Sequence, residues 1–251
     1  MSASLQNRTA LVTGSTDGIG VAIAEALAAQ GAHVVVTGRD VERGEKVVAA
    51  ITGSGGRATF VRADLGRGAA AARELADAAH AVADGPLDIL VNNAALLITP
   101  GATAEVDEDL IDRALAVNIK ATFLLTGLIA PAMAARGHGA IVNMGSINGL
   151  FGMAGSALYS TTKAAVHSLT KSWAAEYGPA GVRVNTVAPG PTVTEKIQAR
   201  MELIAPILAG IPSRRASTPA EVAKAVVFLA GDDAAHIHGA TLSVDGGRAA
   251  V

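Results

Sequence analysis

Tyr159 and Lys163 are the pair of side chains in this sequence whose types and spacing suggest chemistry. Four residues apart on a helix, they would lie on one face about one turn from each other. An ammonium group near a phenol favours the phenolate and lowers the phenol pKa from its usual value of about 10. Such a tyrosine could transfer a proton to or from an alcohol or ketone oxygen. By itself the spacing is far more typical of an ordinary amphipathic helix.

A glycine-rich turn near the N-terminus predicts a second functional region. The apolar strand Thr9–Thr13 leads into the turn Gly14–Gly20, and the helix Ile19–Gln30 and the strand His33–Thr37 follow. Glycines let the backbone approach a pyrophosphate, and the helix N-terminus favours its negative charge. A strand, turn, helix and strand within about 30 residues therefore predict a dinucleotide-binding unit, with a tight structural turn as the alternative.

The residues after the second strand bear on which dinucleotide is used. An arginine there can neutralise the 2′-phosphate of NADP, whereas a carboxylate would bind the ribose hydroxyl of NAD. Arg39 occupies the nearer position and favours NADP, with NAD as the alternative. Two carboxylates argue the other way, because Asp40 is adjacent and Asp17 lies in the glycine turn.

Alternating strands and helices continue along the whole chain. Further strands are predicted at 57–64, 87–91, 140–144, 182–187 and 241–247. Helices are predicted at 41–52, 69–83 and 107–136, around Tyr159, and from Thr218 onward. The pattern predicts an α/β fold, a single doubly wound Rossmann-type domain over residues 1–251, with about seven parallel strands and helices on both faces.

Within this pattern two polar residues have competing interpretations. Asp64, which precedes Leu65 at the end of a strand, could meet an adenine edge or cap the next helix. Asn118 lies inside the helix predicted at 107–136, although asparagine is a weak helix former, and solvent exposure would be the simplest explanation.

The composition excludes several other classes of protein. The chain has no cysteine, which excludes disulfides and thiolate chemistry. The net charge of −2 argues against nucleic acid as a partner. The first eight residues contain no apolar run, and no uninterrupted apolar segment reaches about 20 residues, so we expect a cytoplasmic protein without a membrane span. The six histidines form no compact pattern, and no metal site is predicted.

Eight short motifs in order resemble the classical short-chain dehydrogenase/reductase family from Thr9 to the end of the chain. They are Thr13-Gly14-x-x-x-Gly18-Ile19-Gly20, Asp64-Leu65, Asn92-Asn93-Ala94, Asn118, Ser146, Tyr159-x-x-x-Lys163, Pro189-Gly190 and Val244-Asp245-Gly246-Gly247. Ser146 precedes Tyr159 by thirteen residues, as the family pattern requires. One departure is Ala95, where the family usually has glycine.

The resemblance implies an oxidoreductase that transfers a hydride between a nicotinamide cofactor and a secondary alcohol or ketone. Tyr159 would be the general acid or base, Lys163 would lower its pKa and bind the nicotinamide ribose, Ser146 would hold the substrate oxygen and Asn118 would position a relay water. The cofactor contacts that it implies are Gly14, Ser15, Thr16, Asp17, Gly18, Ile19, Gly20, Arg39, Asp64, Leu65, Asn92, Ala94, Tyr159, Lys163, Pro189, Gly190, Thr192 and Thr194. A homotetramer is also typical of the family.

The substrate is less well defined. We expect the pocket to be lined by Leu96, Ser146, Ile147, Met153 and Tyr159, together with the largely apolar segment 193–211. A hydrophobic ketone, a sugar-derived alcohol and a short acyl substrate fit in that order. A 3-oxoacyl-[acyl carrier protein] reductase is an alternative, but Arg136 is the one basic residue where such enzymes dock the carrier, and the turn 178–181 has no charge. A non-catalytic dinucleotide sensor is the alternative from another class.

Overall fold

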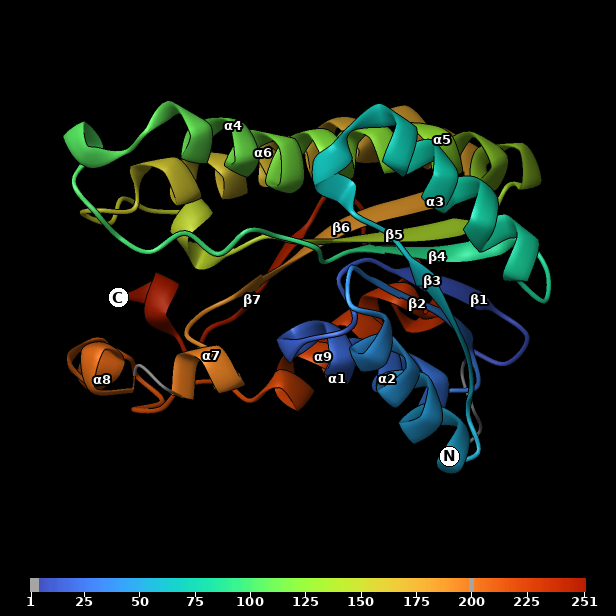
Figure 1. Ribbon diagram of the computed structural model, residues 1–251, viewed down its shortest axis with the longest axis horizontal. Coiled ribbons are helices and arrows are strands. Elements are labelled where there is room, and N and C mark those ends of the chain that lie inside the picture. The colour runs from blue at the N-terminus through green and yellow to red at the C-terminus, as the bar shows by residue number, and fades with distance from the viewer. Residues whose placement is uncertain (1–4, 199–200) are drawn as a thin grey trace.

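A seven-stranded parallel sheet forms the centre of the molecule in the computed structural model, which describes residues 5–198 and 201–251 (Figure 1). The strands are β1 (Thr9–Val12), β2 (His33–Gly38), β3 (Arg57–Arg62), β4 (Leu87–Asn92), β5 (Gly139–Met144), β6 (Val182–Pro189) and β7 (Thr241–Val244), in the order β3-β2-β1-β4-β5-β6-β7. This arrangement confirms the predicted doubly wound Rossmann-type fold.

Helices cover both faces of the sheet (Figure 1). One face carries α1 (Gly18–Ala29), α2 (Val41–Gly53) and α9 (Pro219–Ala230), and the other carries α3 (Ala69–Val82), α4 (Glu108–Leu115), α5 (Ala121–Arg136) and α6 (Ala157–Tyr177). Two short helices, α7 (Glu195–Gln198) and α8 (Met201–Gly210), lie beyond one end of the sheet. A strand that is covered on both sides presents apolar side chains to both faces, as the centre of β2 shows: Val34 and Val36 belong to one core cluster and Val35 to the other.

The strand order reverses at β1, and this reversal defines where a ligand can bind. From β1 the chain builds outward through β2 and β3, then returns to place β4 on the other side of β1. In open parallel sheets, ligands bind at the carboxyl ends of the strands beside such a switch point. The glycine turn that follows β1 and the asparagines at the end of β4 both lie there.

The long helical stretch predicted at 107–136 is present from Glu108 to Arg136, but its geometry changes in the middle. A π-helical turn, Ala116–Lys120, separates α4 from α5. Asn118 is 2% exposed, so solvent exposure does not explain this residue. Its side chain instead accepts a hydrogen bond from the backbone N–H of Leu96 (2.6 Å) and donates one to the carbonyl of Leu96 (3.1 Å). Single π-helical turns of this kind occur frequently at functional sites.

The stretch from Glu108 to Arg136 is also long and apolar enough to cross a membrane by length and composition alone. In this fold it lies along the sheet between α3 and α6 (Figure 1). Helices that pack in a protein core meet the same criteria of length and composition.

Candidate active site

Tyr159 and Ser146 come together where β5 ends and α6 begins. Ser146 follows β5 and is 8% exposed, and its hydroxyl lies beside the phenol of Tyr159. Burial raises the pKa of Tyr159, and the Ser146 hydroxyl partly opposes this increase. A desolvated phenol and a hydroxyl in contact are suited to hold one oxygen atom of a substrate between them.

Lys163 lies one turn further along α6 and is 4% exposed. Its ammonium donates a hydrogen bond to the carbonyl of Met144 (2.8 Å) and lies 5.8 Å from the ring centroid of Tyr159. Burial lowers the pKa of Lys163 to about 8. In the chain alone burial dominates the pKa of Tyr159, so the predicted lowering by Lys163 stays a prediction.

Asn118 is connected to the same helix through one hydroxyl group. Its amide donates to Oγ1 of Thr162 (3.1 Å), and that hydroxyl donates to the carbonyl of Tyr159 (2.8 Å). The four predicted catalytic residues therefore converge from the π-helical turn, the end of β5 and the start of α6. Thr162 was not recognised in the sequence, although its place between Tyr159 and Lys163 could have suggested a structural role.

The glycine turn is packed too closely for larger residues. Gly14 has φ +62°, and a Cβ atom on it would lie 2.9 Å from Cα of Ala94. Gly18 has φ +54°, and its Cβ would lie 3.3 Å from Cγ2 of Thr194. The glycine turn, Ala94 and Thr194 are therefore adjacent although they are far apart in sequence. Their role as parts of one binding site stays a prediction.

Hydrogen bonds from the end of β4 hold this turn in place. The hydroxyl of Thr13 accepts from the backbone N–H groups of Asn93 and Ala94, both at 2.9 Å. The Asn93 amide donates to the carbonyls of Thr13 (2.9 Å) and Gly14 (3.0 Å). The predicted contact Asn92 instead points inward, where its amide donates to Asn143 (2.8 Å). Its position does not support a side-chain contact with the cofactor, and Asn93 is the asparagine that faces the turn.

The side chains of two further predicted cofactor residues, Ser15 and Asp64, form hydrogen bonds with the backbone of the chain itself. The buried hydroxyl of Ser15 donates to the carbonyl of Val12 (2.7 Å) and accepts from the N–H of Thr37 (2.9 Å), which fastens the turn to β2. Asp64 accepts from the N–H of Gly66 (3.1 Å) and caps the short 3-10 helix Leu65–Arg67, whereas Gly68 precedes α3, the helix that the sequence predicted next.

The residues predicted to select the cofactor surround the end of β2. Arg39 is exposed immediately after this strand. A second arginine, Arg43 in the first turn of α2, lies 3.7 Å from the carboxylate of Asp17 and 3.6 Å from that of Asp40. Asp40 also caps α2 through the N–H of Arg43 (3.1 Å). Arg43 was overlooked in the sequence, where its i,i+3 spacing from Asp40 was the available signal.

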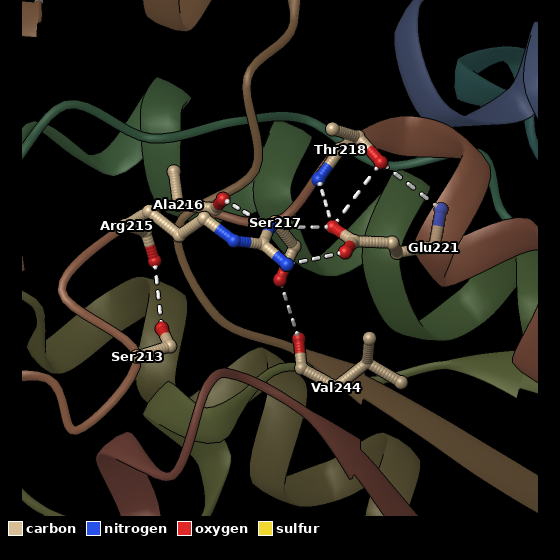
Figure 2. Close-up of polar contacts among 7 residues, drawn as sticks. All are labelled: Ser213, Arg215, Ala216, Ser217, Thr218, Glu221 and Val244. Carbon is tan, nitrogen blue, oxygen red and sulfur yellow. Dashed lines mark hydrogen bonds and ion pairs between the residues drawn. The ribbon is translucent and has the colours of Figure 1, made fainter.

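The segment that carries Thr192 and Thr194 is fixed by the chain that returns from α8. The N–H of Ser217 donates to the carbonyl of Pro191 (2.9 Å), and Val193 donates to the carbonyl of Ser217 (2.8 Å). Figure 2 shows the hydroxyl of Ser217 donating to Val244 (3.2 Å) and, beside it, the carboxylate of Glu221 binding Arg215. The predicted contacts Pro189 and Gly190 lie at the end of β6, where Gly190 donates to Val244 (3.1 Å).

The predicted substrate residues differ in accessibility. Leu96 and Met153 are partly exposed, whereas Ile147 is 3% exposed and its side chain offers almost no surface to a ligand. The same region also makes a contact that the sequence did not predict: the guanidinium of Arg248 lies 5.6 Å from the ring centroid of Phe151. The loop between Ser146 and Tyr159 therefore lies against the C-terminal end of the chain.

The geometry of this site, on this fold, places the chain in the short-chain dehydrogenase/reductase family. A family model described as enoyl-(acyl carrier protein) reductase matches residues 14–249. Dehydrogenase/reductase SDR family member 4 from Bos taurus is 40% identical over 249 residues, covering 97% of this chain and 88% of the relative. These matches show a nicotinamide-dependent oxidoreductase.

Solved structures agree with this assignment. A short-chain dehydrogenase/reductase from Serratia marcescens has a TM-score of 0.92 and 38% identity, covering 98% of this chain and 99% of that one. A candidate NAD(P)-dependent gluconate 5-dehydrogenase from Beutenbergia cavernae, crystallised with NADP at low occupancy, has a TM-score of 0.93 and 38% identity, with full coverage of both chains.

The residues of this chain fit a nicotinamide dinucleotide. The glycine turn presents backbone where side chains would fill the space, and it leads directly into α1. Asp17, at the N-cap of α1, makes no side-chain capping bond, so the first N–H groups of the helix are not satisfied by it. An anionic pyrophosphate is a suitable partner for such a helix N-terminus.

Proposed function

We propose that the protein interconverts a secondary alcohol and a ketone, with NADP(H) as its preferred cofactor. The observation that carries this proposal is the Tyr159 phenol, which lies beside the Ser146 hydroxyl and is followed one turn later by the buried Lys163. These three residues lie at the same edge of the sheet as the glycine turn. A proton donor and a dinucleotide turn on one edge match a carbonyl reduction.

The bound cofactor would supply or accept the hydride at the substrate carbon. The residues of the chain manage the oxygen atom: Ser146 and Tyr159 hold it, and Tyr159 donates a proton in reduction or accepts one in oxidation. The ammonium of Lys163, with a pKa of about 8, can exchange a proton near neutral pH. Asn118 braces the start of α6 through Thr162.

The preference for NADP(H) is supported by the charges after β2. Arg39 has an exposed guanidinium there, and the two carboxylates that argued for NAD both face Arg43. Their paired charges oppose a 2′-phosphate less than free carboxylates would.

The apolar, partly exposed side chains of Leu96 and Met153 support a hydrophobic ketone as substrate. A carrier-bound 3-oxoacyl substrate is less well supported, although one similar structure is described as a candidate β-ketoacyl carrier protein reductase. Arg136, the basic residue expected to dock the carrier, donates to the carbonyls of Ala132 (3.1 Å) and Leu87 (2.7 Å) of its own chain. Its guanidinium is therefore already engaged.

The first prediction concerns a panel of ketones and short 3-oxoacyl thioesters assayed by absorbance of NADPH and of NADH. Tyr159→Phe should lower kcat by about a hundredfold or more, because the proton donor is lost. Its affinity for the cofactor, measured by nicotinamide fluorescence, should stay within about twofold of wild type. Tyr177→Phe is the matched control, since Tyr177 is the only other tyrosine and lies at the far end of α6.

Retained turnover in Tyr159→Phe would contradict the assignment. A wild-type protein that binds NADPH tightly but reduces no member of the panel would instead favour the sensor interpretation.

A further inference from the structure

His167 is a buried, titratable residue that the proposed reaction does not use. It lies on α6 one turn after Lys163 and is 6% exposed. Its ring packs directly against the end of β5, because a Cβ atom placed on Gly145 would collide with Nε2 of His167. Position 145 therefore requires a glycine as long as the His167 ring occupies this place.

Two successive turns of α6 hold the backbone on either side of Gly145. Lys163 donates to the carbonyl of Met144, the residue before it, at 2.8 Å. The N–H of Ser146, the residue after it, donates to Nε2 of His167 at 3.4 Å. The far side of the ring faces β7, where Nδ1 lies 3.5 Å from Oγ1 of Thr241.

The contact with Ser146 determines the proton on the ring. A backbone N–H can only donate, so Nε2 must carry the lone pair and Nδ1 must carry the hydrogen. His167 therefore has to be neutral to make this bond. A protonated ring would set an N–H group against the N–H of Ser146 and break the contact.

We propose that neutral His167 is a positioning residue: it fixes the backbone of Ser146 and thereby aims the serine hydroxyl at Tyr159. The hydroxyl of Ser146 lies beside the phenol of Tyr159 and accepts from the N–H of Asn148 (3.2 Å), so a shift of its backbone moves it away from both. This inference rests on the proposed roles of Ser146 and Tyr159.

The surroundings of His167 favour the neutral ring. The charged groups that act on it, Lys163 and Lys171, are both cationic and both on α6. The neighbouring parts of the sheet present uncharged groups, with Ser146 after β5, Thr186 on β6 and Thr241 on β7. Burial, which is the largest effect, and the two lysines lower the pKa of His167, a backbone hydrogen bond at Ser146 raises it, and the pKa stays below its ordinary value of 6.5. Positioning should therefore be intact at neutral pH and lost at lower pH.

Two substitutions at His167 test the role of its lone pair. In His167→Gln the amide oxygen can still accept from Ser146 and does not titrate. In His167→Leu a side chain of similar bulk leaves the Ser146 N–H without an acceptor. His80→Gln, on an exposed part of α3, is the matched control.

We expect wild-type kcat to fall on the acid side with the pKa of His167, which nitrogen-detected NMR of the histidine rings measures in the protein without cofactor. His167→Gln should keep kcat within about twofold at pH 8 and lose this acid limb. His167→Leu should lose kcat several-fold at every pH while its KM for NADPH stays unchanged. NMR should show the Nδ1–H tautomer.

An Nε2–H tautomer, an acid limb shared by wild type and His167→Gln, or full kcat in His167→Leu would overturn the proposal. If His167→Leu does not fold, the pH profile of His167→Gln decides. Because the tautomer is read without turnover, failure here is distinguishable from failure of the proposed reaction, which would show as an inactive wild-type enzyme.

Discussion

At the scale of single residues, the cofactor preference depends on side chains of opposite charge near the end of β2. Arg39 favoured NADP, whereas Asp17 and Asp40 favoured NAD. The structure adds Arg43, whose guanidinium lies within 4 Å of both carboxylates. The contact between Arg43 and Asp17 could not be predicted from the sequence, because it forms only where the glycine turn lies against the first turn of α2.

The second prediction tests this balance. Arg39→Ala should raise the KM for NADPH by about tenfold or more, because a charge-assisted contact with the 2′-phosphate is lost, and should change the KM for NADH little. Arg73→Ala, at an exposed position on α3, is the control. An equal change for both cofactors would mean that Arg39 does not read the phosphate.

At the scale of elements, the segment between β6 and α9 owes its place to a small polar cluster (Figure 2). The carboxylate of Glu221 accepts from Arg215 (2.8 Å and 2.5 Å) and from the N–H of Thr218 (2.8 Å), which completes a capping box on α9. These bonds hold Ser217 beside Pro191 and Val193, next to the predicted nicotinamide contacts. The cap was predictable from Thr218 and Glu221, whereas the pairing with β6 was not.

The third prediction is that Glu221→Ala lowers the melting temperature and raises the KM for the cofactor, while Glu45→Ala, exposed on α2, changes neither. The bond to Arg215 keeps the pKa of Glu221 at about 2, below its ordinary value of 4.5. A depressed carboxylate pKa stabilises the fold above pH 4.5, and this contribution is lost as the pH falls towards 2. The difference in melting temperature should therefore be constant from pH 6 to 8; a difference that varied there would contradict this account.

At the scale of the whole molecule, the outer face of α4 and α5 has the composition of a contact surface. Leu115 is 38% exposed and Phe123 is 53% exposed, on either side of the π-helical turn, and both line a hollow in this face. We propose that a second copy of the chain covers it within a homotetramer. Exposed apolar groups gathered on one face are typical of subunit contacts.

The fourth prediction is that Phe123→Asp yields a smaller oligomer than wild type in sedimentation velocity, because a carboxylate would be buried without a partner. Val41→Asp, at an exposed position on α2, should leave the oligomer unchanged. A wild-type protein that sediments as a monomer would refute the proposal directly.

The sequence by itself determined the order of strands and helices, the glycine turn and the spacing of Ser146, Tyr159 and Lys163. Those features depend on local periodicity and on short motifs, in which residue type alone carries the information. For the same reason the capping box of α9 was recognisable before the fold was known.

Only the tertiary structure decided which side chains meet across the chain. It directed Asn92 inward and Asn93 towards the glycine turn, buried Ile147, inserted a π-helical turn at Asn118 and placed His167 against Gly145. Each outcome is a contact between segments distant in sequence, set by how closely packed elements approach and by which buried polar groups need partners. Periodicity along one segment carries no information about such contacts.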